Sequence, residues 1–470
     1  MLKKSMYLCL AVSLPAFAAD DTAQRLWQNT RQAVQVQERK NVADDAIQTG
    51  MENPQQEIQQ DTGEALFVAV NHSDWPEVRR LLAQYRQQPD HDEDLALFAD
   101  AALSKADGNM KAARQKYETL LQRQPDFTRG RLDLARLLFD DHLNREAAAE
   151  FAKAAQEPLP EPVLSNIRSF QTAIDQRQSL QGSFNIGSVW NSNVNEGAGG
   201  FKCNAEFEGE CIDYWNSPEP QSALGLKYEA ALSKHWQVQG HHGIAARALA
   251  FGRVYRNRQE HNEHTLNLSA GYQFTNARRS LTLSPLWEWS AEGSHASHRA
   301  HGARAEWNEN KGKWAWNTET EWKKLKYFDE ESAHNNGNSF AVYNTLTYMP
   351  REDWALFGGL DWQKRTTEDG QGDYRQPALR IGAGKQFAGG FDASALAILQ
   401  HRSYKADDAI FEQRRRDNEQ IYILSAGAER WSIAGMKPTF TFKHRRVNSN
   451  IEWLYRYRQN EVGLSLVKVF

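Results

Sequence analysis

Much of the C-terminal part of the chain alternates between apolar and polar residues. In HTLNLSAGYQF, residues 264–274, the apolar side chains from Leu266 to Phe274 fall on one side of an extended chain. The same period of two recurs in LGLKYEAAL, LTLSPLWEW and WAWNTETEW, and it predicts β-strands. We expect about fourteen, near residues 180–191, 222–233, 236–250, 263–275, 280–292, 300–309, 313–326, 339–349, 354–366, 376–387, 391–404, 418–432, 438–448 and 459–470.

The connections between the predicted strands differ systematically in length. Short joins, SKH, NAR, NKGK, PRED, AGG and IAGMK, alternate with longer ones such as residues 191–221 and 327–338, and only the join near 294–299 breaks the rule. Short turns at one rim and long loops at the other are typical of an outer-membrane β-barrel. A soluble sandwich or propeller is the alternative, but its strands usually have only about 5–6 residues.

A barrel also accounts for the polarity of the chain. The mean hydropathy is −0.73, and no apolar run reaches the roughly 20 residues of a spanning helix. In a barrel one face of each strand meets lipid and the other meets a polar lumen. The predicted lumen-facing charges carry both signs, which disfavours a porin for a charged solute: Lys227, Glu229, Glu319, Glu321, Lys323, Arg380 and Glu429.

Residues 64–162 instead have helical spacing. A tetratricopeptide pattern of small, aromatic and proline residues is formed by Ala101, Gly108, Ala113, Tyr117 and Pro125. A step of 34 residues, the period of that repeat, leads to Ala135, Ala147 and Phe151, and from Pro125 to Leu159 between two prolines. A degenerate earlier copy is expected at residues 64–89. An ordinary helical bundle is the alternative, whereas such repeats usually bind a segment of another protein.

The N-terminus has the organisation of a secretory signal. Two lysines precede an apolar segment, and Ala16-Phe17-Ala18 predicts cleavage after Ala18. We therefore expect a signal peptide at 1–18, a polar tether at 19–62, a periplasmic helical domain at 63–175 and a barrel at 180–470. In an oxidising compartment the remaining Cys203 and Cys211 favour a loop disulfide, with two free thiols as the alternative.

No enzymatic chemistry is indicated by the motifs. A phosphate loop, a dinucleotide fingerprint and a zinc-protease motif are all absent from the sequence, so we expect neither catalytic residues nor a cofactor. His295, His298 and His301 would bind a metal jointly only in a loop, because a strand places neighbours on opposite faces. Arg414 to Arg416 lie in a predicted outer loop, where they either contact lipopolysaccharide phosphates or an acidic partner, or are simply solvated. The net charge of −4 predicts no binding to nucleic acid.

The order of these parts resembles a known family. A signal peptide, a small tetratricopeptide domain and a barrel opening with LQGSFNIGSVWNSNVNEG, which includes Asn191 to Asn195, are similar to the surface lipoprotein assembly modulators, also described as the outer-membrane component of a type XI secretion system. The resemblance implies a periplasmic repeat domain that engages client proteins and a barrel that helps to move them across the outer membrane. It implies surface lipoproteins, or related secreted haem- or metal-acquisition or host-interaction proteins, as clients.

The direction of the chain and the partners follow from this interpretation. An even number of strands returns Phe470 to the periplasm, where a terminal aromatic residue suits recognition by the barrel-assembly machinery. The expected partners are a client protein, that machinery with periplasmic chaperones, and outer-membrane lipid. The long loops would be extracellular. An exopolysaccharide exporter is the second hypothesis, although such proteins usually carry longer repeat arrays, and a barrel enzyme such as a protease or lipase is the third.

Overall fold

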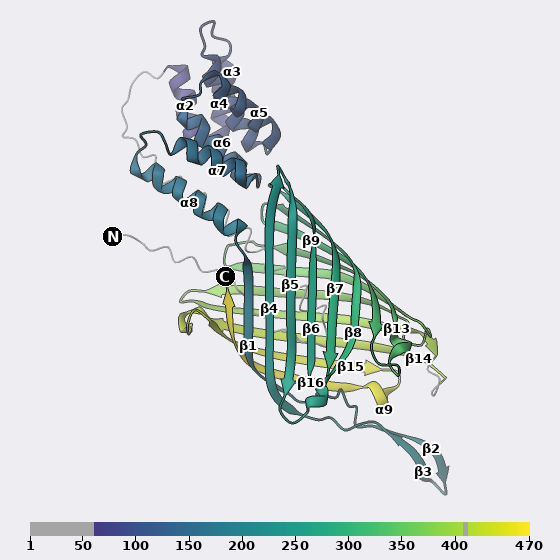
Figure 1. Cartoon of the computed structure of the whole chain (residues 1–470). Coiled ribbons are helices and arrows are strands. Elements are labelled where there is room, and N and C mark those ends of the chain that lie inside the picture. The colour runs from purple at the N-terminus through teal and green to yellow at the C-terminus, as the bar shows by residue number, and fades with distance from the viewer. Residues whose placement is uncertain (1–60, 408–411) are drawn as a thin grey trace.

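The computed structural model describes residues 61–407 and 412–470, which form a helical region followed by a barrel (Figure 1). The predicted signal cleavage at Ala18 and the tether lie outside these residues. Within the described ranges, none of the helices has the length and apolar character required to cross a membrane. The helices are α2 (Thr62–Asn71), α3 (Trp75–Tyr85), α4 (Glu93–Ala106), α5 (Met110–Arg123), α6 (Thr128–Asp140), α7 (Asn144–Ala154) and α8 (Glu161–Gln178).

Three helical hairpins, α2–α3, α4–α5 and α6–α7, turn in the same way. The residue at the tight point of each turn has a positive φ: 56° at Ser73, 76° at Gly108 and 60° at His142. In the first two hairpins the second helix begins at a capping side chain: Asp74 accepts the backbone N–H of Glu77, and Asn109 accepts that of Ala112. Gly108 is thus a turn residue that glycine suits, and the earlier copy predicted at residues 64–89 is present as α2 and α3.

The helical region has an ordinary apolar core. Phe98 is fully buried, and its ring lies 5.3 Å from that of Phe127 and 6.2 Å from that of Tyr117 between ring centroids. The last helix closes the stack, because Phe170 of α8 packs against Phe139 and Phe151 at centroid distances of 5.1 and 4.9 Å. Burial of such rings is the main source of stability in this region.

The barrel confirms the prediction of fourteen antiparallel strands, counted within the described part of the chain. It closes where the first strand pairs with the last, in the order β1-β16-β15 down to β4. The small hairpin of β2 (Phe201–Phe207) and β3 (Glu210–Asn216) stands apart from it. The barrel strands are β1 (Gln181–Asn191), β4 (Ala223–Gln239), β5 (His242–Tyr255), β6 (Glu263–Thr275), β7 (Arg279–Glu292), β8 (His295–Lys311), β9 (Trp314–Tyr327), β10 (Gly337–Tyr348), β11 (Trp354–Thr367), β12 (Tyr374–Phe387), β13 (Phe391–Asp407), β14 (Arg414–Ala428), β15 (Lys437–Ser449) and β16 (Tyr457–Val469).

The predicted turn SKH, residues 233–235, is wrong. β4 continues through it to Gln239, and the chain turns at Gly240, whose φ is 55°. In the register, Ser233 pairs with Arg247 and Lys234 with Ala246, and the Lys234 ammonium lies 5.6 Å from the Trp236 ring centroid. Three consecutive polar residues resemble a turn in the sequence, but here Ser233 and His235 face the lumen and Lys234 faces outward.

Three further predictions are corrected at the strand ends. Glu429 does not face the lumen, because β14 ends at Ala428 and Glu429 is exposed in a short 3-10 turn. Arg414 to Arg416 are not in a loop but begin β14, where Arg416 pairs with Ser403. His295, His298 and His301 all lie in β8, whose extended backbone does not bring the three imidazoles to one point.

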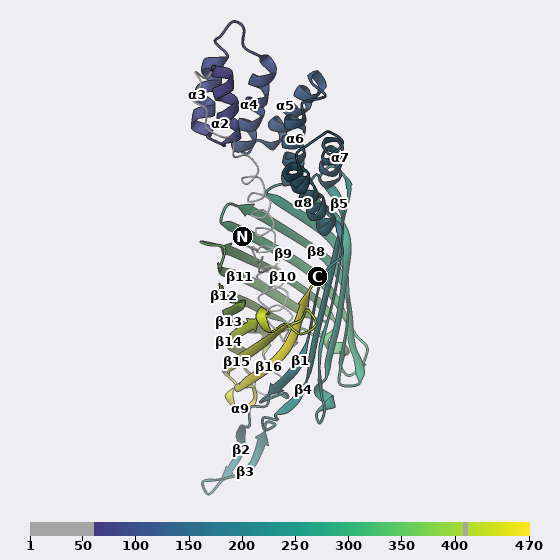
Figure 2. The same ribbon diagram turned by 90° about the vertical axis from the view of Figure 1, so that its left-hand side faces the viewer.

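The two ends of the barrel differ. The helical region lies at the rim of the short turns, whereas the β2–β3 hairpin projects from the opposite rim, as Figures 1 and 2 show. We call the first the inner rim and the second the outer rim. Side chains alternate along the wall between them: Trp362 is 37 % exposed and Leu360 67 %, whereas Asp361 between them is 6 % exposed.

Candidate functional site at the inner mouth of the barrel

The loop between α6 and α7 attaches the helical region to the inner rim. Both carboxylate oxygens of Asp141 bind barrel turns: Oδ2 lies 2.9 Å from Nε2 of His241 between β4 and β5, and Oδ1 accepts the backbone N–H of Ala277 between β6 and β7 at 3.0 Å. One aspartate therefore connects two turns of the barrel to one loop of the helical region.

The start of α7 adds a second set of contacts. The backbone N–H of Arg145, one of the helix-terminal donors without an intrahelical partner, donates to Oε1 of Gln237 at 2.9 Å. Its guanidinium donates to the carbonyl of Val238 at 2.8 Å, and the amide nitrogen of Gln237 donates to Glu146 at 2.8 Å. We call Asp141, Arg145, Glu146, Gln237 and His241 the joint.

The charge of the joint depends on pH. The hydrogen bond that His241 donates to Asp141 raises the pKa of His241 above its usual value. The carboxylate charge also raises this pKa, whereas partial burial and the charge of Arg114 lower it. A protonated His241 and an ionised Asp141 form an ion pair. The joint therefore gains an electrostatic attraction as the imidazole binds a proton.

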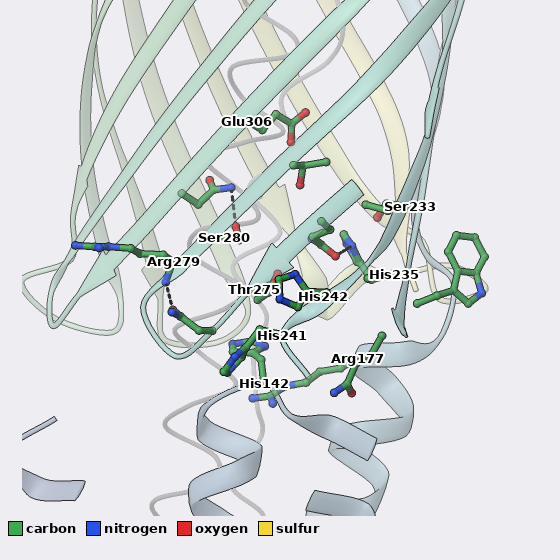
Figure 3. A pocket seen from close by; sticks show the side chains of 18 of the residues that line it. His142, Arg177, Ser233, His235, His241, His242, Thr275, Arg279, Ser280 and Glu306 are labelled. Atoms are coloured by element: carbon green, nitrogen blue, oxygen red, sulfur yellow. Dashed lines mark hydrogen bonds between the residues drawn. The ribbon is translucent and has the colours of Figure 1, made fainter. Parts of the chain in front are cut away.

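A cavity of about 300 Å³ lies directly above the joint, inside the inner mouth (Figure 3). We call it the mouth cavity. Its walls come from the α6–α7 loop, the end of α8 and the inner ends of several barrel strands. Hydrogen-bonding side chains dominate the lining, among them His142, Arg177, His235, Arg247, Ser280 and Glu306. Such a surface suits a polar or peptide-like guest that can exchange hydrogen bonds with it.

The lumen above this cavity carries buried ion pairs. Nε of Arg304 lies 2.7 Å from Oε1 of Glu321 and 3.2 Å from Oε1 of Glu319. Arg380 binds Asp361 with two nitrogens, at 2.6 and 2.8 Å. Glu319, Glu321 and Arg380, predicted to face the lumen, are at most 2 % exposed, and Lys227 and Glu229 are also buried inside the barrel.

The seam between β1 and β16 closes the barrel. It is paired from Ser183 with Val469 to Asn191 with Glu461, and at the inner rim Gly182 and Phe470 exchange backbone hydrogen bonds of 2.8 and 2.9 Å. A Cβ at Gly182 would lie 2.6 Å from the Phe470 ring, so a glycine here allows the terminal ring to pack across the seam. Phe470, predicted as an assembly signal, thus lies at the inner rim beside β1.

The outer end of the seam is fastened by side chains of the segment that follows β1. Ser192 donates its backbone N–H to Asn460 at 2.9 Å and accepts that residue's N–H at 2.8 Å. The Asn193 amide donates to the Arg458 carbonyl at 3.2 Å, and Gln459 donates to the Asn193 carbonyl at 2.6 Å. We call residues 192–193 with 458–460 the clasp.

The tetratricopeptide residues predicted from the sequence occupy the interior of the helical hairpins, apart from the turn residues. Ala101, Ala113, Ala135 and Ala147 are 0 % exposed, and Tyr117 and Phe151 are at most 2 % exposed. Pro125 lies between α5 and α6. These residues build the stack and do not line the mouth. Cys203 and Cys211 form a disulfide across the hairpin of β2 and β3 at the outer rim.

The joint was missed by sequence analysis. Asp141, Arg145 and Gln237 are ordinary polar residues at helix ends and strand ends, and no spacing links the α6–α7 loop to turns about a hundred residues further on. The only indication available was the position of His142 in the place that Gly108 occupies one repeat earlier. Residues 191–195, which include part of the clasp, did carry the resemblance to the family, but the sequence did not indicate that they fasten the seam.

Comparison with protein families decides the relationship. A model described as "Surface lipoprotein assembly modifier" matches residues 181–470, and one described as "Surface lipoprotein assembly modifier, N-terminal TPR repeats" matches residues 52–151. The chain belongs to the surface lipoprotein assembly modifier family. The resemblance stated from the sequence and the tetratricopeptide assignment are both confirmed.

Individual relatives match this chain along most of their length. "Hemophilin secretion modulator" of Acinetobacter baumannii is 30 % identical, with 99 % of each chain covered. "Surface lipoprotein assembly modifier 1" of Neisseria meningitidis is 26 % identical over 93 % of this chain and 87 % of the relative. The protein of the same name from Haemophilus influenzae is also 26 % identical, over 86 % of this chain and 84 % of the relative.

Proposed function

We propose that this outer-membrane barrel receives a specific client protein from its helical region and assists its export or display at the cell surface. The client is a surface lipoprotein or a related secreted protein of the hemophilin kind. Two relatives named above support this class, because their names state surface lipoprotein assembly and hemophilin secretion. The inner rim with its helices faces the periplasm, and the outer rim with the β2–β3 hairpin faces the outside.

The observation that carries the proposal is the joint. A repeat region that only bound a partner would need no fixed position, yet Asp141 and Arg145 attach it to the turns of β4–β7. The mouth cavity lies between the two regions and is lined by both. A client segment held by the helices is therefore presented to a polar opening and does not have to find it by diffusion.

The two alternative functions have less support. The family match covers both the helical region and the barrel, so the combination of the two no longer favours the hypothesis of a polysaccharide exporter. The family consists of transporter-like proteins, and the role proposed here for the buried charges of the lumen is structural, since Arg304 and Arg380 are each hydrogen-bonded to carboxylates. We propose no catalytic residue.

Deletion of the gene, with complementation by the full chain, tests the proposal. We expect loss of one or a few proteins from the surface or the medium, their accumulation in the periplasm, and recovery on complementation. Exported polysaccharide is measured in the same strains as a control. Loss of polysaccharide with an unchanged surface proteome would contradict the proposal. Cleavage of lipid or peptide by the purified protein would favour the enzyme hypothesis.

A further inference from the structure

Like charges face each other on the outward side of the barrel at its outer rim. In the strand register Arg299 of β8 pairs with Lys326 of β9, and Lys364 of β11 pairs with Arg375 of β12. A third such pair joins Arg446 of β15 to Arg458 of β16. Directly opposed residues have Cβ atoms only about 4.5–5.5 Å apart, so two cations in these positions repel each other.

Nothing in the described chain neutralises these three pairs. Among residues 61–407 and 412–470, none of the six cations forms an ion pair with a carboxylate. Arg299 lies 5.9 Å from the Phe328 ring centroid, and Arg446 donates to the neutral side chain of Asn448 at 3.1 Å. Asp373, two residues before Arg375, instead lies 3.9 Å from the Lys405 ammonium.

The side chains on the membrane side of the Lys364–Arg375 pair are apolar. Trp362 and Leu360 lie below Lys364 on the outward face of β11, and Leu379 lies below Arg375 on β12. Trp362 packs edge-on against Phe340 of β10 at 5.9 Å between ring centroids. At the other two pairs one polar pair, His301 with Lys324 or His444 with Asn460, comes before the outward apolar residues Trp322 and Phe442. A ligand that fits this surface therefore has an anionic group at the rim and hydrocarbon below it.

We propose that the three cation pairs, Arg299 with Lys326, Lys364 with Arg375, and Arg446 with Arg458, bind the phosphates of lipopolysaccharide in the outer leaflet. Each pair places two donors on one phosphate, which removes the repulsion between them. The acyl chains of the same molecule cover the outward Trp, Leu and Phe side chains. Free inorganic phosphate has no such second contact. The proposal does not depend on the client.

The choice of lipid over a protein partner rests on the position of the pairs. They occur on β8–β9, β11–β12 and β15–β16, on well-separated strands of the barrel wall, and all face outward at one rim. A single protein domain would contact one patch of that circumference, whereas a leaflet surrounds it. All three pairs also lie on the outer-rim side of the apolar band, which is the depth of a lipid headgroup.

The test uses the purified full chain in detergent with added lipopolysaccharide, and it records the thermal unfolding midpoint and the amount of lipid bound. The variant carries Lys364→Gln and Arg375→Gln. The matched control, Lys385→Gln with Lys468→Gln, removes two outward cations near the inner rim. We expect lipopolysaccharide to raise the midpoint of the wild type and the control, and the variant to need on the order of tenfold more lipid.

Several outcomes would overturn the proposal. If the control variant loses as much lipid binding as Lys364→Gln with Arg375→Gln, the effect is one of non-specific charge. If dephosphorylated lipid A raises the unfolding midpoint as much as lipopolysaccharide does, the phosphates are not recognised. An equal rise with inorganic phosphate alone would exclude the lipid as the specific ligand. Heat-modified migration in gels verifies that each variant is folded. The charge-preserving variant Lys364→Arg with Arg375→Lys should bind like the wild type, and its failure would also contradict the proposal.

Discussion

The helical region has an apolar interior, whereas the barrel also buries many charged side chains in its lumen. In the helices Phe98 and Ala101 are fully buried. In the barrel Glu319 is equally buried, whereas Leu360 is 67 % exposed. Each arrangement fits its surroundings, because apolar groups leave water in the first case and face lipid in the second. The same substitution should therefore have consequences of different size in the two regions, and this can be tested.

The largest effect is expected for Phe98→Ala. The ring is fully buried among three other aromatic rings, so its removal should cost about 3–5 kcal/mol of unfolding free energy and unfold the helices while the barrel persists. The matched variant Phe340→Ala, on the outward face of β10, should cost much less. Helical circular dichroism and heat-modified gel migration follow the two regions separately. Joint loss of both signals in Phe98→Ala would contradict this separation.

A comparable cost is expected inside the barrel from loss of a charge. Asp361→Ala leaves the buried guanidinium of Arg380 without its carboxylate, which should cost about 3–5 kcal/mol. Asp353→Ala breaks an exposed pair with Arg351 at an inner turn and should cost about 0–1 kcal/mol. Urea unfolding in detergent micelles measures both. Similar losses in the two variants would show that the lumen is as polar as the surface.

A charge on the lipid face should be the next most damaging change. Leu360→Arg puts a guanidinium in the middle of β11 on the outward side, and the expected cost is about 2–4 kcal/mol in a bilayer. Leu360→Met at the same site should be close to neutral. The refolding yield into liposomes measures the difference between Leu360→Arg and Leu360→Met. If both variants insert equally well, the outward face of β11 does not meet hydrocarbon.

The smallest effect concerns the joint. The raised pKa of His241 means that its pairing with Asp141 is fully present below about pH 6.5, the ordinary histidine value, and is lost as pH rises through the raised value. Hydrogen exchange of the α6–α7 loop should therefore be slower at pH 6 than at pH 8. After correction for the intrinsic exchange rates, which themselves depend on pH, His241→Gln should remove this difference. A pH effect that persists in the variant would assign it to another group.

Periodicity was sufficient to predict the architecture. A period of two with alternating connection lengths gave the fourteen strands, and a step of 34 residues gave the helical hairpins. It failed where a local pattern had two explanations. Ser233 and His235 are polar because they face the lumen, and with the outward Lys234 between them they look like a turn. Glu429 fits the apolar–polar alternation of β14, but the strand ends at Ala428 and Glu429 lies in the 3-10 turn that follows.

The candidate site could not be predicted in the same way. The joint connects Asp141 to His241 and Ala277, which only the three-dimensional fold brings together. The clasp depends on Asn193 meeting the start of β16, at the other end of the barrel sequence. Residues of this kind are determined by contacts between distant parts of the chain, which follow no sequence period. Ala101 and Tyr117 instead pack within one repeat, so their residue types recur at the period of the repeat.

The most direct test is to break the joint while both regions stay folded. Asp141→Ala with Arg145→Ala removes the side-chain contacts with His241, Ala277 and Val238. The measurement is the surface signal of the client, relative to its total amount, in cells that express the variant. If the helical region delivers the client to the mouth, the signal falls severalfold and the client accumulates in the periplasm. Undiminished display, with the variant folded and equally abundant, would contradict the account.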